Sequence, residues 1–194
     1  IVKYILSITQ TGKPKLPVPA KGTMALKEHK TEELRGVYTL TATYTDGGAD
    51  GAGALSSTSM INLRPAKVRA VYTDQQSGFA RFGNNLANGD HKSFLLLKNI
   101  DLNHIGGFVF EYSSKDKSGE VEVRRDSQAG PVISLTNYGA TGAWDSVATV
   151  RGTVKEPVEG THDLYFIFKK PQKPNEDIIN IKSIMFEPDE RKRQ

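Results

Sequence analysis

A period of two between hydrophobic and polar residues recurs along most of this chain and predicts strands with one buried face. The period is clear in residues 37–44, VYTLTATY, and in residues 119–125, GEVEVRR. A near-continuous hydrophobic run, residues 164–168, predicts a central strand that is buried on both faces. Short strands of this kind, separated by turns rich in glycine, proline and aspartate, predict an all-β protein of the sandwich type.

The remaining strands follow from shorter runs of the same pattern. They are predicted at residues 57–63, 68–71, 93–97, 106–112, 132–135, 148–154 and 178–186. Residues 37–63 form a hairpin around the glycine-rich segment 45–55, TDGGADGAGAL. The polar segments 73–78, 78–88 and 136–142 are predicted as loops, and Gly89-Asp90 as a tight turn.

The N-terminal segment follows a different pattern. The spacing of Ile1, Tyr4, Ile5 and Ile8 fits the stripe of an amphipathic helix, although the frequent isoleucine and valine would also suit a strand. Residues 11–21 carry three prolines and a glycine, which predicts an extended linker with polyproline character.

The predicted organisation therefore has four parts. Residues 1–21 form a terminal helix and a proline-rich linker, and residues 22–65 an added β-hairpin region packed on the sandwich. Residues 66–188 form a jelly-roll β-sandwich, and residues 189–194 a charged tail. Because the chain begins without methionine, we expect it to be a piece of a longer protein.

Composition narrows the range of functions. The net charge of +4 over 194 residues is mild, and the lysines and arginines are not interleaved with aromatic residues, so no nucleic-acid surface is predicted. No hydrophobic run is long enough to span a bilayer, and no membrane insertion is expected. The chain has no cysteine, which removes disulfides, thiol catalysis and cysteine-based metal sites.

Recognisable catalytic and metal-binding motifs are missing from the sequence. The four histidines are isolated, and no HExxH, GxSxG or GxGxxG motif occurs. The DGGADG segment within residues 45–55 lacks the ligand spacing and closing glutamate of an EF-hand, so we interpret it as a plain loop. The sequence therefore gives no support to an enzyme.

The single tryptophan of the chain, Trp144, ends a glycine-bearing loop between two predicted strands. Two interpretations are open at this point. The ring either belongs to the hydrophobic core, or it offers an exposed flat surface for a ligand.

Four motifs in order resemble the family 6 carbohydrate-binding modules. The central one combines Arg124-Arg125-Asp126, Gly130-Pro131-Val132-Ile133 and Thr141-Gly142-Ala143-Trp144, similar to the family's strand, turn and "TGxW". Residues 160–168 resemble its "GxHxLYLxF" strand, and Ile179-Asn180-Ile181 with Phe186 resembles its closing strand. Gly89-Asp90 before Ser93-Phe94 resembles "GDWxxY", with His91 in place of the aromatic residue. The resemblance covers about residues 66–187.

This resemblance implies a non-catalytic β-sandwich that binds glycan chains in a cleft among the loops at one end. Trp144 would form one aromatic wall, and Asn180 would bind sugar hydroxyls, unless it is a structural amide that caps the preceding loop. Phe82 is the first candidate for the second wall, and Phe79 the next, with a place in the core as the alternative for both. Tyr138, on the Trp144 loop, is a further candidate.

The family often holds a structural calcium with the carboxylates of an "EAE" segment and an aspartate near the closing strand. Here the matching stretch is Arg69-Ala70-Val71, and the closing strand carries Lys182. A site that needs several hard oxygen ligands is therefore not expected at this place.

The first residues resemble another family. Tyr4-Ile5-Leu6-Ser7 is similar to the last helix of a small c-type cytochrome domain, a domain found upstream of sugar-binding modules in long exported bacterial proteins with a sugar dehydrogenase. The expected function is thus to target a larger secreted, periplasmic or cell-surface protein to an oligo- or polysaccharide. The alternative is a structural or protein-docking sandwich that has lost sugar binding.

Overall fold

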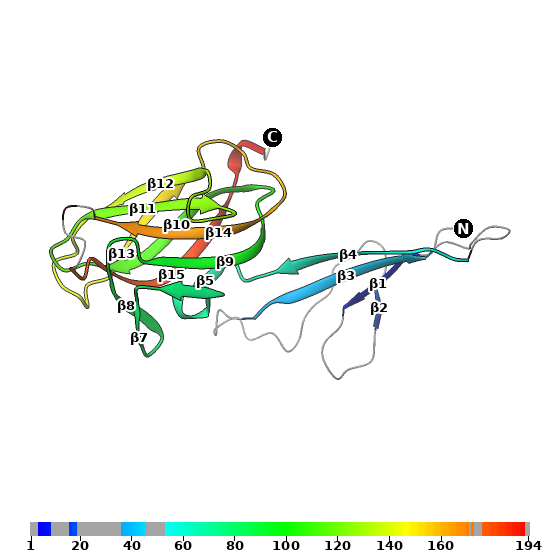
Figure 1. Cartoon of the computed structure of the whole chain (residues 1–194), viewed down its shortest axis with the longest axis horizontal. Coiled ribbons are helices and arrows are strands. Elements are labelled where there is room, and N and C mark those ends of the chain that lie inside the picture. The colour runs from blue at the N-terminus through cyan, green and yellow to red at the C-terminus, as the bar shows by residue number, and fades with distance from the viewer. Residues whose placement is uncertain are drawn as a thin grey trace. The chain divides into compact units, whose positions relative to one another are not determined.

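The structure, a computed structural model, describes residues 4–8, 16–18, 36–45, 53–170, 172 and 176–192. The chain divides into two compact units, residues 1–65 and residues 66–194, and each is described by itself. Apart from two short 3-10 turns, η2 (Ala70–Tyr72) and η3 (Glu190–Lys192), the regular elements of the described residues are strands (Figure 1). The all-β class is confirmed. Within the described residues, no helix has the length and hydrophobicity that a membrane span needs.

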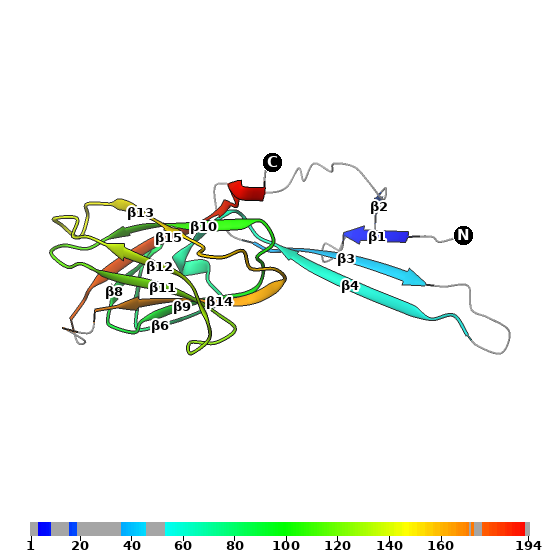
Figure 2. The ribbon, with the colours of Figure 1, turned by 90° about the horizontal axis from the view of Figure 1, so that it is seen from above.

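The first unit is a four-stranded antiparallel sheet (Figure 2). Its order is β2 (Leu16–Val18), β1 (Tyr4–Ile8), β3 (Tyr38–Thr45) and β4 (Ser56–Leu63). Strands β3 and β4 pair in unbroken register from Tyr38 opposite Leu63 to Thr45 opposite Ser56, which confirms the predicted hairpin. The DGGADG segment of its turn lies outside the described residues.

The predicted N-terminal helix is wrong. Residues 4–8 form strand β1, which pairs with β3 from Tyr4 opposite Tyr44 to Ile8 opposite Leu40. The spacing of the isoleucines suited both a helix and a strand, and pairing along the neighbouring β3 decides between them by satisfying the backbone groups of β1. Part of the predicted linker is also regular, because β2 pairs with β1 at Leu6, Ser7 and Ile8.

The second unit contains two antiparallel sheets (Figures 1 and 2). The first has the order β13 (Ala148–Thr153), β10 (Ile105–Ser113), β15 (Ile179–Pro188), β8 (Asn85–Gly89) and β7 (Ala80–Phe82), and β5 (Lys67–Arg69) also pairs with β15. The second has the order β12 (Val132–Tyr138), β11 (Gly119–Arg125), β14 (Thr161–Lys169), β9 (Phe94–Asp101) and β6 (Gln75–Ser77). This arrangement confirms the β-sandwich.

The core lies between the two sheets and is built from aromatic rings. Phe108 and Phe110 of β10 both make edge-on contacts with Phe166 of β14, at centroid distances of 5.6 and 6.0 Å. Phe108 also contacts Phe186 of β15 at 5.5 Å. These rings alternate with outward-facing residues, so the period of two in the sequence places them correctly.

Two predicted loops are strands in the structure. Segment 78–88 holds the hairpin of β7 and β8, and segment 73–78 holds β6, the edge strand beside β9. Strand β12 continues through Tyr138, although residues 136–142 were expected to form a loop. Its buried residues Ser134 and Thr136 are polar, so the hydrophobic period ended before the strand did.

Gly130 closes the turn between β11 and β12 and has no room for a side chain. A Cβ at this position would lie 1.9 Å from the carbonyl oxygen of Arg125. We expect Gly130→Ala to lower the free energy of unfolding by about 1–3 kcal/mol, because backbone atoms must move to admit the methyl group. Urea denaturation measures the change.

Gly139→Ala is the matched control, since a Cβ there meets nothing within 4 Å. Equal stability of the two variants would contradict the turn geometry described here.

Candidate functional site

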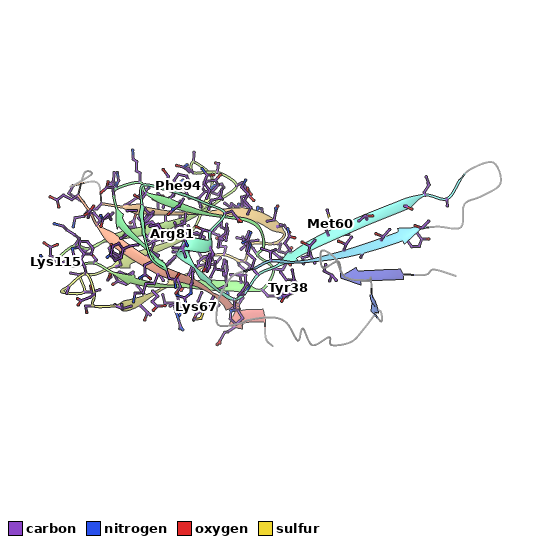
Figure 3. All side chains as sticks on the ribbon, turned by 90° about the horizontal axis from the view of Figure 1, so that it is seen from below. Tyr38, Met60, Lys67, Arg81, Phe94 and Lys115 are labelled. Carbon is purple, nitrogen blue, oxygen red and sulfur yellow. The ribbon has the colours of Figure 1, made fainter. Side chains whose placement is uncertain are left out.

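Several strand connections of the sandwich gather at one end, which we call the loop end. It comprises residues 114–118 between β10 and β11, and residues 139–147 between β12 and β13 (Figure 1). Lys115, in the first connection, lies at this extremity of the sandwich (Figure 3). Trp144 belongs to the second connection, so the sequence motif places it at the loop end.

The Trp144 connection is pinned to the end of β10. The backbone N–H of Thr141 donates to the carbonyl oxygen of Ser114 at 2.6 Å, and the N–H of Ser114 donates to Thr141 Oγ1 at 3.0 Å. Gly142 donates to the carbonyl oxygen of Lys115 at 2.8 Å and has a φ of +88°, a conformation that favours glycine. The "TGxW" residues therefore hold the connection in one place before any ligand arrives.

Ser113, the last residue of β10, links the two leading site candidates. Its Oγ donates to the carbonyl oxygen of Trp144 at 2.6 Å, and its backbone lies opposite Asn180 in the β10–β15 pairing. Trp144 is 36% exposed. The structure thus places the backbones of Trp144 and Asn180 on either side of Ser113 and leaves part of Trp144 open to solvent.

The side-chain amide of Asn180 has a fixed orientation. The backbone N–H of Asn88, in β8, donates to Asn180 Oδ1 at 3.0 Å. Because a backbone N–H can only donate, the oxygen of the amide must face Asn88. Among the described residues, none accepts a hydrogen bond from Asn180 Nδ2, so the amide presents two donor hydrogens at the loop end.

Phe79 packs into the core. Its ring meets Phe168 edge-on at 5.3 Å, and it lies so close to Gly89 that a Cβ there would be 2.3 Å from the ring. Phe79 is partly buried and packs against the hydrophobic core. Phe79 is therefore the core residue that the sequence left as its alternative.

Tyr138 is buried too, with only 3% of its surface exposed. Its ring contacts Tyr112 edge-on at a centroid distance of 5.4 Å. Tyr138 is the last residue of β12 and faces inward, which the expected loop did not predict. A buried ring cannot stack on a sugar, so the interpretation of Tyr138 as an aromatic wall is corrected.

Phe82 is 79% exposed, the highest value among the large hydrophobic residues that the structure describes. It lies opposite Asn85 at the turn of the β7–β8 hairpin, and β7 is the edge strand of its sheet. Neighbouring strands are about 5 Å apart, so two strand spacings put β7 about 10 Å from β15 and Asn180. Phe82 is therefore available to a ligand, at about two strand spacings from the strand that carries Asn180.

A pocket of about 690 Å³ lies at the ends of the second sheet's strands β11, β12 and β14. The residues that line it are polar or charged apart from Gly119 and Tyr138, and they include His91, Lys92, Asn137 and Lys170. None of Trp144, Asn180, Phe79 and Phe82 is part of this lining. The pocket and the tryptophan surface are therefore separate features of the same end.

Charges next to the pocket are arranged around Glu122 of β11. This buried carboxylate is paired with Arg124 at 2.7 Å and with Lys169. Burial alone would raise the pKa of Glu122, but hydrogen bonds from Arg124 and Lys169 outweigh it and lower the pKa below its usual range. Lys169 is thus already neutralised by a carboxylate.

His91 has a fixed tautomer. The backbone N–H of Lys170 donates to His91 Nδ1 at 3.0 Å, so the neutral ring carries its proton on Nε2. Burial, followed by the charges of Lys92 and Lys169, lowers the pKa of His91 below its ordinary value. At neutral pH the ring is therefore uncharged and can donate from Nε2.

The stretch that matches the family's calcium segment does not fit a metal. Arg69 lies in β5 opposite Ser183 of β15, next to Lys182, so two cations stand where carboxylates would be needed. No group of three or more histidine, aspartate or glutamate side chains that could hold a metal ion occurs among the residues the structure describes. No metal enters the chemistry considered below.

Some residues of the loop end were not found from the sequence. Ser113, Ser114 and Asn88 position Trp144 and Asn180 through side-chain and backbone hydrogen bonds. Nothing in the sequence signals that Asn88 meets Asn180, 92 residues later. The pocket at His91 and Lys170 was missed for the same reason, since it depends on the pairing of distant strands.

Comparisons with known proteins agree with the fold. Residues 63–188 match the family described as "Carbohydrate binding module (family 6)". No curated protein matches the chain.

Solved structures with the same fold include three family 6 modules. A β-1,3-glucan-binding module from Bacillus halodurans is 22% identical, with a TM-score of 0.55, covering 62% of this chain and 93% of its own. A module from Clostridium cellulolyticum in complex with xylose is 24% identical, with a TM-score of 0.56 and coverages of 62% and 95%. A module from Clostridium stercorarium in complex with cellobiose is 17% identical, with a TM-score of 0.53 and coverages of 63% and 93%.

Removing the Ser113 hydroxyl should loosen the Trp144 connection. We expect Ser113→Ala to reduce stability by about 1 kcal/mol through loss of its hydrogen bond to the Trp144 carbonyl. Acrylamide quenching of the single tryptophan should become more efficient, because the connection opens more often.

Ser127→Ala, at an exposed turn residue of the opposite end, is the control and should leave quenching unchanged. Identical quenching in the two variants would show that Ser113 does not hold the connection.

Proposed function

Because the chain belongs to the family 6 carbohydrate-binding modules, we propose that its non-catalytic sandwich binds a glycan chain at the loop end, through Trp144 and Asn180. The observation that supports this proposal is the position of Ser113, which bonds the backbone of the exposed Trp144 and pairs with the strand residue Asn180. The printed names of the similar structures concern β-1,3-glucan, xylose and cellobiose, and they support a saccharide as the class of ligand.

The two residues supply the two interactions that sugar recognition needs. A sugar ring has a face of C–H groups that packs on the flat surface of an aromatic ring, and Trp144 offers such a surface. The sugar hydroxyls around that face need donors and acceptors. The free Nδ2 hydrogens of Asn180 donate, while its Oδ1 is held by Asn88.

The Trp144 connection is a preformed surface for the glycan. Its hydrogen bonds to Ser113, Ser114 and Lys115 fix it before the ligand arrives. Little conformational entropy is then lost on binding, so a single aromatic wall can give measurable affinity.

A module without catalytic groups acts through the protein to which it is attached. We therefore propose that it holds a larger secreted, periplasmic or cell-surface protein near its glycan. The proposed cytochrome and sugar-dehydrogenase context relied on a helix at residues 1–8, and strand β1 removes that support.

Affinity electrophoresis through gels that contain soluble polysaccharides tests the proposal. The intact chain should be retarded by at least one polysaccharide, and Trp144→Ala should weaken binding roughly tenfold by removing the stacking surface. Val147→Ala, which shortens an exposed hydrophobic residue of the same connection, should leave retardation unchanged.

Asn180→Asp gives a sharper test of the amide. The aspartate keeps an oxygen for the Asn88 N–H but loses both donor hydrogens, so binding should weaken roughly tenfold without loss of stability. If no polysaccharide retards the intact chain, the proposal is wrong and the sandwich serves as a structural or docking domain.

Phe82 is proposed as an outlying contact that only a long chain reaches. We expect Phe82→Ala to weaken the binding of long oligosaccharides severalfold and to leave the binding of disaccharides unchanged. Isothermal titration calorimetry with oligosaccharides of increasing length checks this expectation. Equal losses at every length would mean that Phe82 lies in the same subsite as Trp144.

A further inference from the structure

We propose that the pocket bounded by His91, Lys92, Lys170 and Tyr138 binds an acidic group, a carboxylate or a sulfate ester, carried by a sugar unit. This inference rests on the proposed function only in taking a glycan as the carrier of the group. The pocket adds a preference for negatively charged sugars to a module whose tryptophan surface has no preference for charge.

Of the three lysines that line the pocket, Lys92 and Lys170 form no ion pair among the described residues. Lys170 Nζ donates to the carbonyl oxygen of Ser118 at 3.0 Å, an uncharged acceptor. Among the ion pairs of the described residues, none includes Lys92 or Lys170, whereas Lys169 is paired with Glu122. The lining therefore has a surplus of positive charge, since Glu120 supplies one carboxylate against these two ammonium groups.

Neutral donors reinforce this charge. His91 carries its ring proton on Nε2, because Nδ1 accepts from the Lys170 backbone. Tyr138 is 3% exposed, and among the described residues its hydroxyl has no hydrogen-bond partner. Burial raises the pKa of Tyr138, so the hydroxyl keeps its proton at neutral pH.

Gly119 packs against that hydroxyl. It lines the pocket, and a Cβ at this position would lie 2.4 Å from Tyr138 Oη. Glycine is therefore the residue that allows the strand to pass this close to the tyrosine at the edge of the pocket.

The size of the pocket favours a group on a larger molecule over a bare ion. Its volume of about 690 Å³ is in the range of sites for small organic ligands. A neutral sugar would find no exposed aromatic surface in the lining, since the Tyr138 ring is buried. Donors and positive charge, without a stacking surface, select an anionic sugar.

The test is NMR titration of the whole chain with four probes. They are an oligogalacturonate, its neutral methyl ester, a sulfated galactan oligosaccharide and sodium sulfate. At least one acidic oligosaccharide should shift the amide signals of residues 91–92 and 118–120, and the ester should not. Lys92→Gln and Lys170→Gln should each weaken this binding at least tenfold.

Lys155→Gln removes the same charge from an exposed position on another part of the sandwich and should change affinity less than twofold. Thermal unfolding of each variant shows that the fold is intact. The Trp144→Ala variant should keep the pocket shifts, which separates this site from the tryptophan surface.

Three results would overturn the inference. They are no pocket shifts with either acidic oligosaccharide, equal shifts with acid and ester, or equal affinity of the intact chain and the two pocket variants. Sodium sulfate that binds as tightly as the acidic oligosaccharides would mean an adventitious ion only. Each of these leaves the proposed function standing if Trp144 still binds neutral glycans.

Discussion

The loop end depends on the pairing of β10 with β15, because Ser113, at the end of that pairing, is bonded to the neighbouring segments. Ser113 lies opposite Asn180 through its backbone and holds the Trp144 carbonyl through its side chain. The neighbouring Ser114 reaches further, to Lys117 and Ile178, and so fastens two more connections. Strand pairing in the core, together with hydrogen bonds from serine hydroxyls at its edge, thus positions the proposed ligand surface. No single segment of the chain could form it.

The same end presents two surfaces of different chemistry. Around Trp144 and Asn180, an aromatic face and an oriented amide suit the C–H groups and hydroxyls of a neutral sugar. In the pocket, the positive charge of Lys92 and Lys170 suits an acidic group. Glu122 neutralises Lys169, the third lysine of the lining, so Lys92 and Lys170 supply the charge available to a ligand.

The sequence predicted the sandwich well because hydrophobic alternation and β-structure share a period of two. It failed where that signal was weak. At β12 the buried residues Ser134 and Thr136 are hydroxyls, so the strand was cut short and Tyr138 was assigned to a loop. At β1 the spacing of hydrophobic residues fitted a helix, while the frequent isoleucine and valine suited a strand. Trp144 and Asn180 were predicted by motif, but their nearness depends on partners far apart in the chain, such as Asn88, which no local pattern reveals.

The most direct measurement is the fluorescence of Trp144 during titration with glycans, because this is the single tryptophan of the chain. If its exposed face stacks on a sugar, a glycan that binds should shift the emission and protect the ring from acrylamide, with saturation at the affinity found by calorimetry. A glycan that binds with the same affinity but leaves emission and quenching unchanged would contradict the central claim that Trp144 forms the binding surface.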